Sequence, residues 1–435
     1  MNHEIEQAIY ELRANAARYA RSERYYRGDH DLAFATEKFQ NAFGTMFREF
    51  ALNLCPAVCD AVRDKLKIVG FGTGSAGSET PKRMGQGEFS KLSSEARRIW
   101  DANRMQVRSG DVHKEALKNG DAYVIVWPDE NGRAALHPNR AENIAVFCDE
   151  HSPGAIRLAA KYWRRADKRF SLILYYPDRI EKYLSASAAD MMFPEAKDLE
   201  ASGPVIANPF GRVPVFHFAN NSDFGALGTS ELAAAMPVQD GLNKSVLDML
   251  VAMEYSAYRQ RWAAGIEFEE DPATGQPKPP FRAGIDHLWI TSNPNASFGD
   301  FNSADLEQFL KVKESFRVDM ACVTGTPLHY LQPSTKGFPS GESLRKAETR
   351  FIAKVRDRQA NFGQAWSDVM SFALMAEGHG RDISIVTHWE DAAAVSEREI
   401  LENILLKKEI GLSTEQALRE AGYASDEIRS AESSN

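Results

Sequence analysis

Residues 237–264 read PVQDGLNKSVLDMLVAMEYSAYRQRWAA, and residues 303–323 read SADLEQFLKVKESFRVDMACV. Both stretches repeat apolar residues at spacings of three and four, which is typical of one face of an α-helix. Between them, residues 265–302 are rich in proline and glycine. Long helices that flank an exposed insert suit a column or a wall better than a pocket. This pattern favours a structural protein that assembles over an enzyme.

Each of the two helices is expected to carry one apolar stripe. The first is predicted over 230–264 and would measure roughly 40 Å from residue 237 onwards, at about 1.5 Å per residue. The second is predicted over 303–324, with Ser303 as its N-terminal cap. The residues expected to pack along these helices are Leu242, Val246, Met249, Met253, Leu306, Phe309 and Phe316.

A loop and a third long helix follow directly. The loop begins with Thr324-Gly325-Thr326-Pro327, and the helix is predicted over 340–376, with a length of roughly 55 Å. One stretch of this helix is basic, and its cations are Arg345, Lys346, Arg350, Lys354, Arg356 and Arg358. They indicate either a solvated or ion-paired helix face, or a surface that neutralises a neighbouring subunit or nearby DNA.

The first half of the chain combines helices with strands. Apolar spacing predicts helices over 4–26, 43–66 with a kink at Pro56, 92–103 and 109–119. Residues 72–90 are rich in glycine and serine and predict a mobile loop. A hairpin is predicted around Asn131-Gly132, and strands are predicted over 122–127, 133–137, 144–148, 155–163, 170–176, 180–184 and 213–217. After the last long helix, one more short strand is predicted over 383–387. The predicted fold class is therefore α+β and mostly helical.

Composition excludes several classes of protein. With 435 residues, the chain is too long for one compact core, so about two to four sub-domains are expected. The formal net charge of −9 argues against tight binding of DNA, which requires a basic surface. The N-terminus lacks the pattern of a signal peptide, and the apolar segment 246–253 is too short to span a bilayer. We expect a protein made and used in the cytoplasm.

No catalytic motif stands out in the sequence. Residues 72–77 (GTGSAG) match a dinucleotide-binding pattern, but Pro81 follows where an apolar helix would have to begin. His217 and His388 are predicted to be satisfied core residues. No cofactor and no metal ion are predicted, because the histidines are scattered and no second cysteine pair stands at zinc-site spacing; the cysteines, expected to be buried and reduced, are Cys55, Cys59, Cys148 and Cys322.

An acidic cluster opens the insert, and it consists of Glu267, Glu269, Glu270 and Asp271. One interpretation of this cluster is a site for a divalent ion, which prefers carboxylate ligands. A solvated face or a surface for a partner is the interpretation that we favour.

Six strings, in this order along the chain, resemble the portal (connector) proteins of tailed bacteriophages, in the branch common among siphophages. They are YYRGDH at 25–30, ALKNGDAYVIVW at 116–127, NPFGRVPVFHFAN at 208–220, GTSEL at 228–232, TGTP at 324–327 and SGESLR at 340–345. None of these strings is catalytic. The resemblance covers nearly the whole chain, and the shared order of the strings is more specific than any one of them.

The resemblance implies a portal-type fold with wing, stem, clip and crown regions. It assigns 1–229 to the wing, 230–264 and 303–324 to the stem, 265–302 to the clip, 325–340 to a tunnel loop that projects towards DNA, 341–394 to the long helix and its return to the wing, and 395–435 to a short crown. The acidic cluster becomes the partner surface of the clip. The residues implied at the DNA channel are Leu328, His329, Tyr330, Gln332, Lys336 and Phe338.

The resemblance also implies a function and a set of partners. Portal proteins form a ring, usually of twelve copies, at one vertex of the virion capsid, and they assemble in the host cytoplasm. Double-stranded DNA passes through the ring during packaging and ejection, bound weakly and without sequence specificity. The implied partners are the large terminase subunit, the major capsid and scaffolding proteins, and head-completion or adaptor proteins. No membrane partner, cofactor or enzymatic activity is implied.

Elementary physics agrees with these implications. The stripe on each stem helix has room to pack against the other helix and against the next subunit. A net acidic channel, with interactions screened over about 8–10 Å, holds a duplex weakly. Lys336, repeated around a ring, would add a local positive band. Two alternatives stay open: another phage head or adaptor protein, and a nucleotide-binding enzyme built on the α+β half.

Overall fold

The structure is a computed structural model that describes residues 2–37, 40–41, 52–73, 86–149, 151–188, 192–224, 227–257, 261–266, 293–300, 306–332, 341–381, 383–393, 397–414 and 417–418. The chain divides into two compact units, Met1–Trp389 and Glu390–Asn435. No helix in the described part of the chain combines the length and the apolar composition that crossing a bilayer requires.

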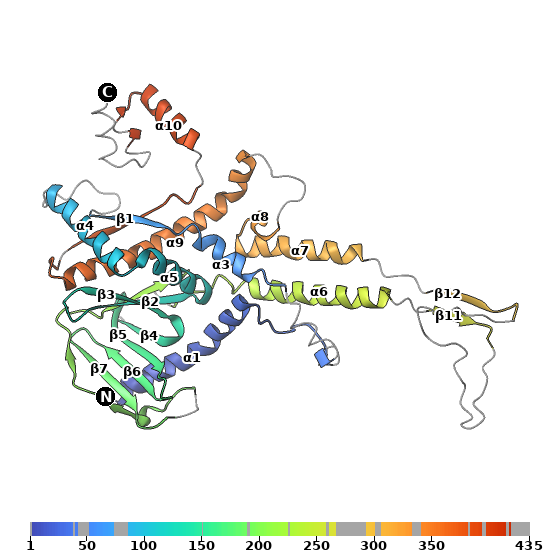
Figure 1. The fold of residues 1–435 in the computed structure, drawn as a ribbon, viewed down its shortest axis with the longest axis horizontal. Coiled ribbons are helices and arrows are strands. Elements are labelled where there is room, and N and C mark those ends of the chain that lie inside the picture. The colour runs from blue at the N-terminus through green and yellow to red at the C-terminus, as the bar shows by residue number, and fades with distance from the viewer. Residues whose placement is uncertain are drawn as a thin grey trace. The chain divides into compact units, whose positions relative to one another are not determined.

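The first unit mixes helices with antiparallel sheets (Figure 1), which confirms the predicted α+β class. Its described helices are α1 (Asn2–Arg27), α3 (Cys55–Arg63), α4 (Gln86–Ala102), α5 (Met105–Asn119), α6 (Ala235–Ala257), α7 (Glu307–Thr324), α8 (Leu328–Leu331) and α9 (Gly341–Ala376). Its described strands are β1 (Ile68–Thr73), β2 (Asp121–Pro128), β3 (Ala134–Arg140), β4 (Ile144–Asp149), β5 (Ser152–Arg164), β6 (Phe170–Tyr175), β7 (Arg179–Ser185), β8 (Leu199–Ala201), β9 (Ile206–Ala207), β10 (Val215–Ala219), β11 (Arg261–Ala264), β12 (Ser297–Asp300) and β13 (Ile385–Trp389).

The described strands pair antiparallel in four groups. Strands β10, β2 and β3 form one sheet with β2 in the middle, and β4 to β8 form a second sheet in which β9 also pairs with β7. Strand β1 pairs with β13, and β11 pairs with β12. Residues 121–126 of β2 are all buried, which explains why this strand reads as an almost continuous apolar run in the sequence.

Helix α1 packs on the second sheet through its apolar stripe. Ile5, Ile9 and Leu12 are buried in one core with Leu158 of β5 and Leu172 of β6. The apolar spacing in residues 4–26 therefore predicted this helix and its buried face correctly.

A second core joins the long helix α9 to the N-terminal half of the unit. Trp366 of α9 is fully buried, and its ring lies 5.0 Å from that of Trp100 in α4 and 4.7 Å from that of Phe218 in β10. Segments more than 100 residues apart thus share one aromatic cluster, which fixes α9 on the sheet around β2. The helix predicted over 340–376 is confirmed by α9.

The structure corrects the helix predicted over 43–66. Helix α3 begins at Cys55, and Pro56 lies in its first turn, where the missing backbone N–H removes no intrahelical hydrogen bond. Pro56 therefore starts a helix rather than kinking one. Residues 42–51 lie outside the described residues.

The stretch 72–90 is not a single loop. Gly72 and Thr73 end strand β1, residues 86–90 open helix α4, and residues 74–85 lie outside the described residues. Strand β1 uses glycine for a packing reason, since a Cβ on Gly72 would lie 2.4 Å from Nε2 of His388 on the paired strand. His388 is itself exposed, so its prediction as a core residue was wrong.

The second unit contains helix α10 (Glu397–Glu409). Gly411 follows it with a φ of 100°, the left-handed conformation expected just past a helix end. Ser396, Gln416 and Gly422 lie outside the described residues.

Candidate functional site

Helices α6 and α7 run side by side (Figure 1) and correspond to the two predicted stem helices. At Gly241 they approach so closely that an added Cβ would lie 2.8 Å from Cε1 of Phe316. Leu242 and Val246, which follow Gly241 on α6, are buried, and so is Met320, one turn beyond Phe316 on α7. The pair is therefore held by a glycine-to-ring contact as well as by apolar side chains.

The boundaries of this pair differ from the predicted ones. Helix α6 ends at Ala257, and residues 261–264 form strand β11 instead of the end of the helix. Trp262 of β11 lies across Gly299 of β12, where a Cβ would come within 2.6 Å of its ring. This cross-strand packing overrides the helical spacing. The insert is therefore flanked by the paired strands β11 and β12, and the first of them begins before residue 265.

At the second helix, α7 begins at Glu307, and Leu306 takes the N-cap position without a side-chain hydrogen bond. Ser303, the predicted cap, lies outside the described residues. The helix continues to Thr324, as predicted.

The predicted packing residues divide by burial within the single chain. Leu242 and Val246 are buried, and Met253 is 45% exposed. The others are half-buried, namely Met249, Leu306, Phe309 and Phe316. Helix α7 also exposes the apolar side chains of Leu310, Val312, Val318 and Val323. The helix pair thus leaves apolar surface in contact with solvent when the chain is alone.

Buried polar residues fasten the start of α6 to the N-terminal segment. The hydroxyl of Tyr25 donates to Asp240 at 2.7 Å, and the side-chain amide of Asn243 lies 2.8 Å from Nδ1 of His30. Burial raises the pKa of Asp240 above its usual value, and the hydrogen bond from Tyr25 opposes that rise. The string YYRGDH at 25–30 therefore docks on α6, the first of the two predicted stem helices.

Asp121 is fully buried at the point where three of the portal-like strings meet. Its Oδ2 accepts hydrogen bonds from Arg18 at 2.7 Å and from Tyr19 at 2.9 Å. Its Oδ1 accepts one from the backbone N–H of Gly228 at 2.7 Å and lies 2.7 Å from Nε2 of His217. A buried carboxylate needs such a set of partners. The arrangement also shows that His217 is satisfied, as predicted.

Two glycines make this meeting point possible. Gly120 ends α5 with a φ of 93°. A Cβ on Gly228 would lie 1.9 Å from the carbonyl oxygen of Gly120 and 2.6 Å from the backbone nitrogen of Asn220. Because both neighbours are backbone atoms, they cannot move aside as a side chain can, and residue 228 has to be glycine.

Glu231 joins the segment before α6 to the long helix α9. It forms salt bridges of 2.5 Å with Lys354 and 2.9 Å with Arg358, and the side chains of Glu231 and Arg358 are 8% and 7% exposed. Burial alone would raise the pKa of Glu231, but the two cations outweigh burial and hold that pKa below its usual value. For Lys354 and Arg358, the ion-paired interpretation of the basic stretch is therefore the right one.

The loop after α7 is held at its first residues. Gly325 adopts a φ of 66°, and the hydroxyl of Thr324 donates to the carbonyl of Met320 at 2.7 Å. The amine of Lys354 donates to the carbonyl of Thr324 at 2.8 Å. The string TGTP therefore forms a tight turn at the end of α7, and a hydrogen bond from Lys354 connects it to α9.

The predicted channel residues fall partly on a short helix. Leu328, His329 and Tyr330 belong to α8, Gln332 follows it, and Lys336 and Phe338 lie outside the described residues. Nε2 of His329 lies 3.0 Å from Oε1 of Glu348, which ties α8 to α9. The tunnel loop predicted over 325–340 therefore begins with an anchored helical turn.

The acidic cluster of the insert, Glu267, Glu269, Glu270 and Asp271, lies outside the described residues. The hairpin of β11 and β12 brackets it along the chain. The dinucleotide-like string is also only partly described, and its first glycine, Gly72, is a paired strand residue.

Sequence reasoning missed the anchoring roles of Asp121, Glu231 and Asp240. A signal was present, because each acid stands inside or next to an apolar or helix-opening string where a charge requires a partner. Their partners, however, come from distant segments and cannot be identified from spacing.

Comparisons with known proteins agree with this architecture. The family model of the phage portal protein, SPP1 Gp6-like, matches residues 76–431. The portal protein of Mycobacterium phage D29 is 26% identical over 330 residues, which are 72% of this chain and 62% of that protein. The portal protein of Mycobacterium phage L5 is 29% identical over 173 residues, which are 39% of this chain and 35% of that protein. This chain therefore spans less than two thirds of the length of either relative.

One solved structure shows a distant likeness. The match to a chain in the neck of a native GTA particle covers 72% of this chain and 79% of the neck chain, with 14% identity. Its TM-score of 0.42 is low, and no conclusion is drawn from it. The family match covers most of the sequence and agrees with the order of the portal-like strings. The chain belongs to the SPP1 Gp6-like family of phage portal proteins.

Proposed function

We propose that copies of this chain close into a ring, usually of twelve, at one capsid vertex, and that double-stranded DNA passes through the ring during packaging and ejection. Membership of the portal family is the observation that carries the proposal. The chain acts as a conduit and a docking platform, and not as an enzyme. It assembles in the host cytoplasm and remains in the virion.

The exposed apolar residues of the helix pair support self-association. Met253 of α6 and Leu310, Val312 and Val318 of α7 are each more than 40% exposed in the single chain. Apolar surface of this kind marks contacts between proteins. When one patch meets a different patch on the next copy, a rotation that closes produces a ring. We assign α6 and α7 to the stem on this basis.

The remaining regions take their roles from the order of elements. Residues 1–229 form the wing, and the insert after β11 forms the clip, where the acidic cluster contacts the large terminase subunit and later the head-completion or adaptor proteins. Residues 395–435 form the crown inside the head, and the major capsid and scaffolding proteins contact the ring from outside.

The charge of the chain suits a weakly held duplex. With a formal net charge of −9, the ring lacks the broad basic surface that neutralises many phosphates. Two of the cations on α9, Lys354 and Arg358, are already committed to Glu231. DNA contact falls instead to the tunnel loop, from Leu328 and Tyr330 on α8 to Lys336 and Phe338 beyond it.

A loop replacement tests the conduit function. Leu331 is 3% exposed, so α8 should be kept and residues 333–339 replaced by seven glycine and serine residues. The variant should assemble as wild type does, and phage that carry it should package or retain less DNA. Assembly together with normal packaging and retention would refute the tunnel-loop assignment.

A further inference from the structure

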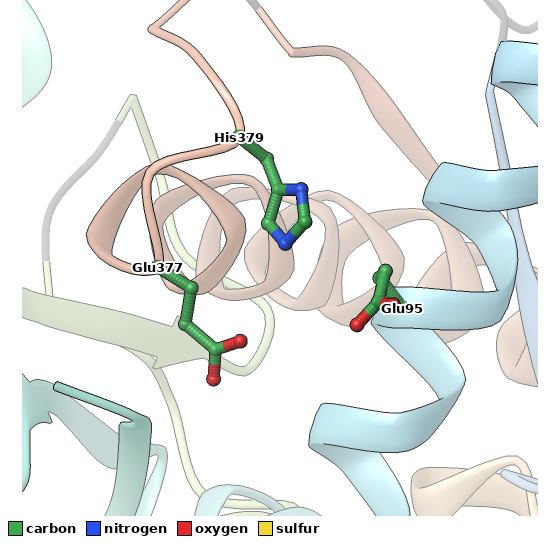
Figure 2. A group of neighbouring side chains, drawn as sticks. All are labelled: Glu95, Glu377 and His379. Atoms are coloured by element: carbon green, nitrogen blue, oxygen red, sulfur yellow. The ribbon is translucent and has the colours of Figure 1, made fainter. Parts of the chain in front are cut away.

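Three potential metal ligands meet where helix α4 passes the end of α9. Figure 2 shows Glu95 on α4, and Glu377 and His379 just beyond α9, with their side chains turned towards one another. One ligand atom from each residue lies within 4.8 Å of the others. Sequence spacing could not reveal this group, because Glu95 and Glu377 lie far apart in the sequence.

We propose that Glu95, Glu377 and His379 bind a zinc ion that fastens α4 to the end of α9. One imidazole and two carboxylates form a donor set that Zn²⁺ accepts, with water completing the tetrahedral shell. Mg²⁺ and Ca²⁺ prefer oxygen ligands alone, so the imidazole of His379 favours zinc over these ions. The proposal goes beyond ring formation and does not depend on it.

The carboxylate of Glu377 is already oriented in the way that metal ligands require. Its Oε1 accepts a hydrogen bond from the backbone N–H of Ala134 at 3.0 Å, which leaves Oε2 to face the other two side chains. A second partner of this kind holds a ligand in place. The Glu377 side chain is also largely buried, with 10% of its surface exposed.

The backbone between the two C-terminal ligands is fixed as well. Gly378 and Gly380 have φ angles of 87° and 122°, and the N–H of His379 donates to the carbonyl of Leu374 at 3.1 Å. This turn ends α9 and places Glu377 and His379 on the same side, facing α4. Within the described part of the chain, no hydrogen bond engages the imidazole of His379, so its nitrogen is available.

Arg98 holds the two carboxylates when no metal is bound. Its guanidinium forms ion pairs with Glu95, at 2.6 Å, and with Glu377. Zinc would therefore have to displace Arg98, which lies on the same helix as Glu95 and is 41% exposed, so it can turn out into water. The group has two mutually exclusive occupants, a guanidinium and a metal ion. Removing Arg98 should therefore strengthen zinc binding.

The test uses the purified full-length protein and zinc alone. Zinc is titrated in competition with a chromophoric chelator, and the midpoint of thermal unfolding is measured with and without zinc. The wild type should bind about one ion per chain and unfold at a higher temperature with zinc. His379→Ala, a change at an exposed side chain, should weaken binding by about tenfold or more and remove the thermal shift. His151→Ala, a change of an exposed histidine elsewhere, should alter neither.

The Arg98→Gln variant gives the distinguishing result. It should bind zinc more tightly than the wild type, because the competing cation is gone. Zinc binding that survives His379→Ala unchanged, or an Arg98→Gln variant that binds zinc no better than the wild type, would overturn the proposal. A titration with Mg²⁺ should produce no thermal shift, and an equal shift with Mg²⁺ would also contradict a zinc site.

Discussion

The indole N–H of Trp366 donates a hydrogen bond to Nε2 of His113 at 2.8 Å, in the core between α5 and α9. Both side chains are fully buried, and Phe362 stacks on the imidazole with 10° between the ring planes. Because Nε2 accepts this bond, the imidazole must be neutral. Burial agrees with that state, since it lowers the pKa of His113 to about 3.

Acid should therefore destabilise the first unit through His113. Between the pKa of an unfolded histidine, about 6.5, and the lowered folded value, the unfolded chain binds one more proton, so the free energy of unfolding falls by about 1.4 kcal/mol per pH unit as the pH drops. His113→Gln has no titrating group, so the advantage of the wild type over it should shrink by about 2 kcal/mol from pH 7 to pH 5. Urea unfolding at both pH values measures this. An advantage that is equal at both pH values would show that His113 is not buried as a neutral base.

The contact between Gly120 and Gly228 predicts a severe effect of a single methyl group. Gly228→Ala would place a Cβ against two backbone segments, and we expect a loss of about 3 kcal/mol or more in the free energy of unfolding. Gly110→Ala is the matched control, because its Cβ would meet nothing within 4 Å and alanine favours the helix by about 1 kcal/mol. Similar stabilities for the two variants would contradict the close approach at residue 228.

The ion triad around Glu231 predicts a large cost of neutralisation. Glu231→Gln leaves Lys354 and Arg358 without their buried partner, and we expect a loss of about 3–5 kcal/mol in the free energy of unfolding at pH 7. Glu195→Gln, which removes one partner of an exposed pair with Lys197, should cost far less, because solvent screens that pair.

The same triad predicts how this cost depends on pH. Because the folded pKa of Glu231 is lowered, its stabilising effect is present above the unfolded value of about 4.3 and is lost as the pH falls through the folded pKa. The difference between the wild type and Glu231→Gln should therefore be constant above about pH 5.5 and should shrink in more acidic solution. A difference that grows with acidity would refute the lowered pKa.

The exposed apolar side chains of α7 predict a variant that folds but does not assemble. Val312 and Val318 are exposed, so replacing both by serine should change the free energy of unfolding of the single chain by only roughly 0.5 kcal/mol per site. Assembly, measured by analytical ultracentrifugation, should be weakened. Glu314→Ser on the same helix is the polar control and should assemble as the wild type does. Equal assembly of all three proteins would remove α7 from the contact between copies.

Local features of the sequence predicted much of this fold, and long-range packing accounts for most of the differences. Helical spacing identified α1 and α9, and the Asn131-Gly132 turn identified the hairpin of β2 and β3, because these signals lie within a few residues of one another. Spacing did not show that residues 261–264 form a strand, because Trp262 is held by Gly299 on a partner strand far along the chain. Strand β1 was missed for the same reason, since it exists through its pairing with β13.

The anchoring residues were harder to predict than the helices they anchor. The sequence shows that Asp121 is an acid in an apolar strand, but Arg18, Tyr19 and Gly228 approach it from three separate segments. The contact between copies that the predicted stem residues would form stays a prediction, because the single chain shows only their burial within one copy. The zinc ligands carry no local signal at all, since two of them follow a helix end and the third, Glu95, lies far from them in the sequence.

The central claim is that identical copies close into a ring around an opening that admits a DNA duplex, with α6 and α7 at the contact between copies. Electron cryomicroscopy of the purified, assembled protein tests this directly. The account predicts a closed ring with a continuous central opening, in which Val312 and Val318 of each copy are covered by neighbouring copies. Particles without a central opening, or a ring in which both side chains face solvent, would contradict it.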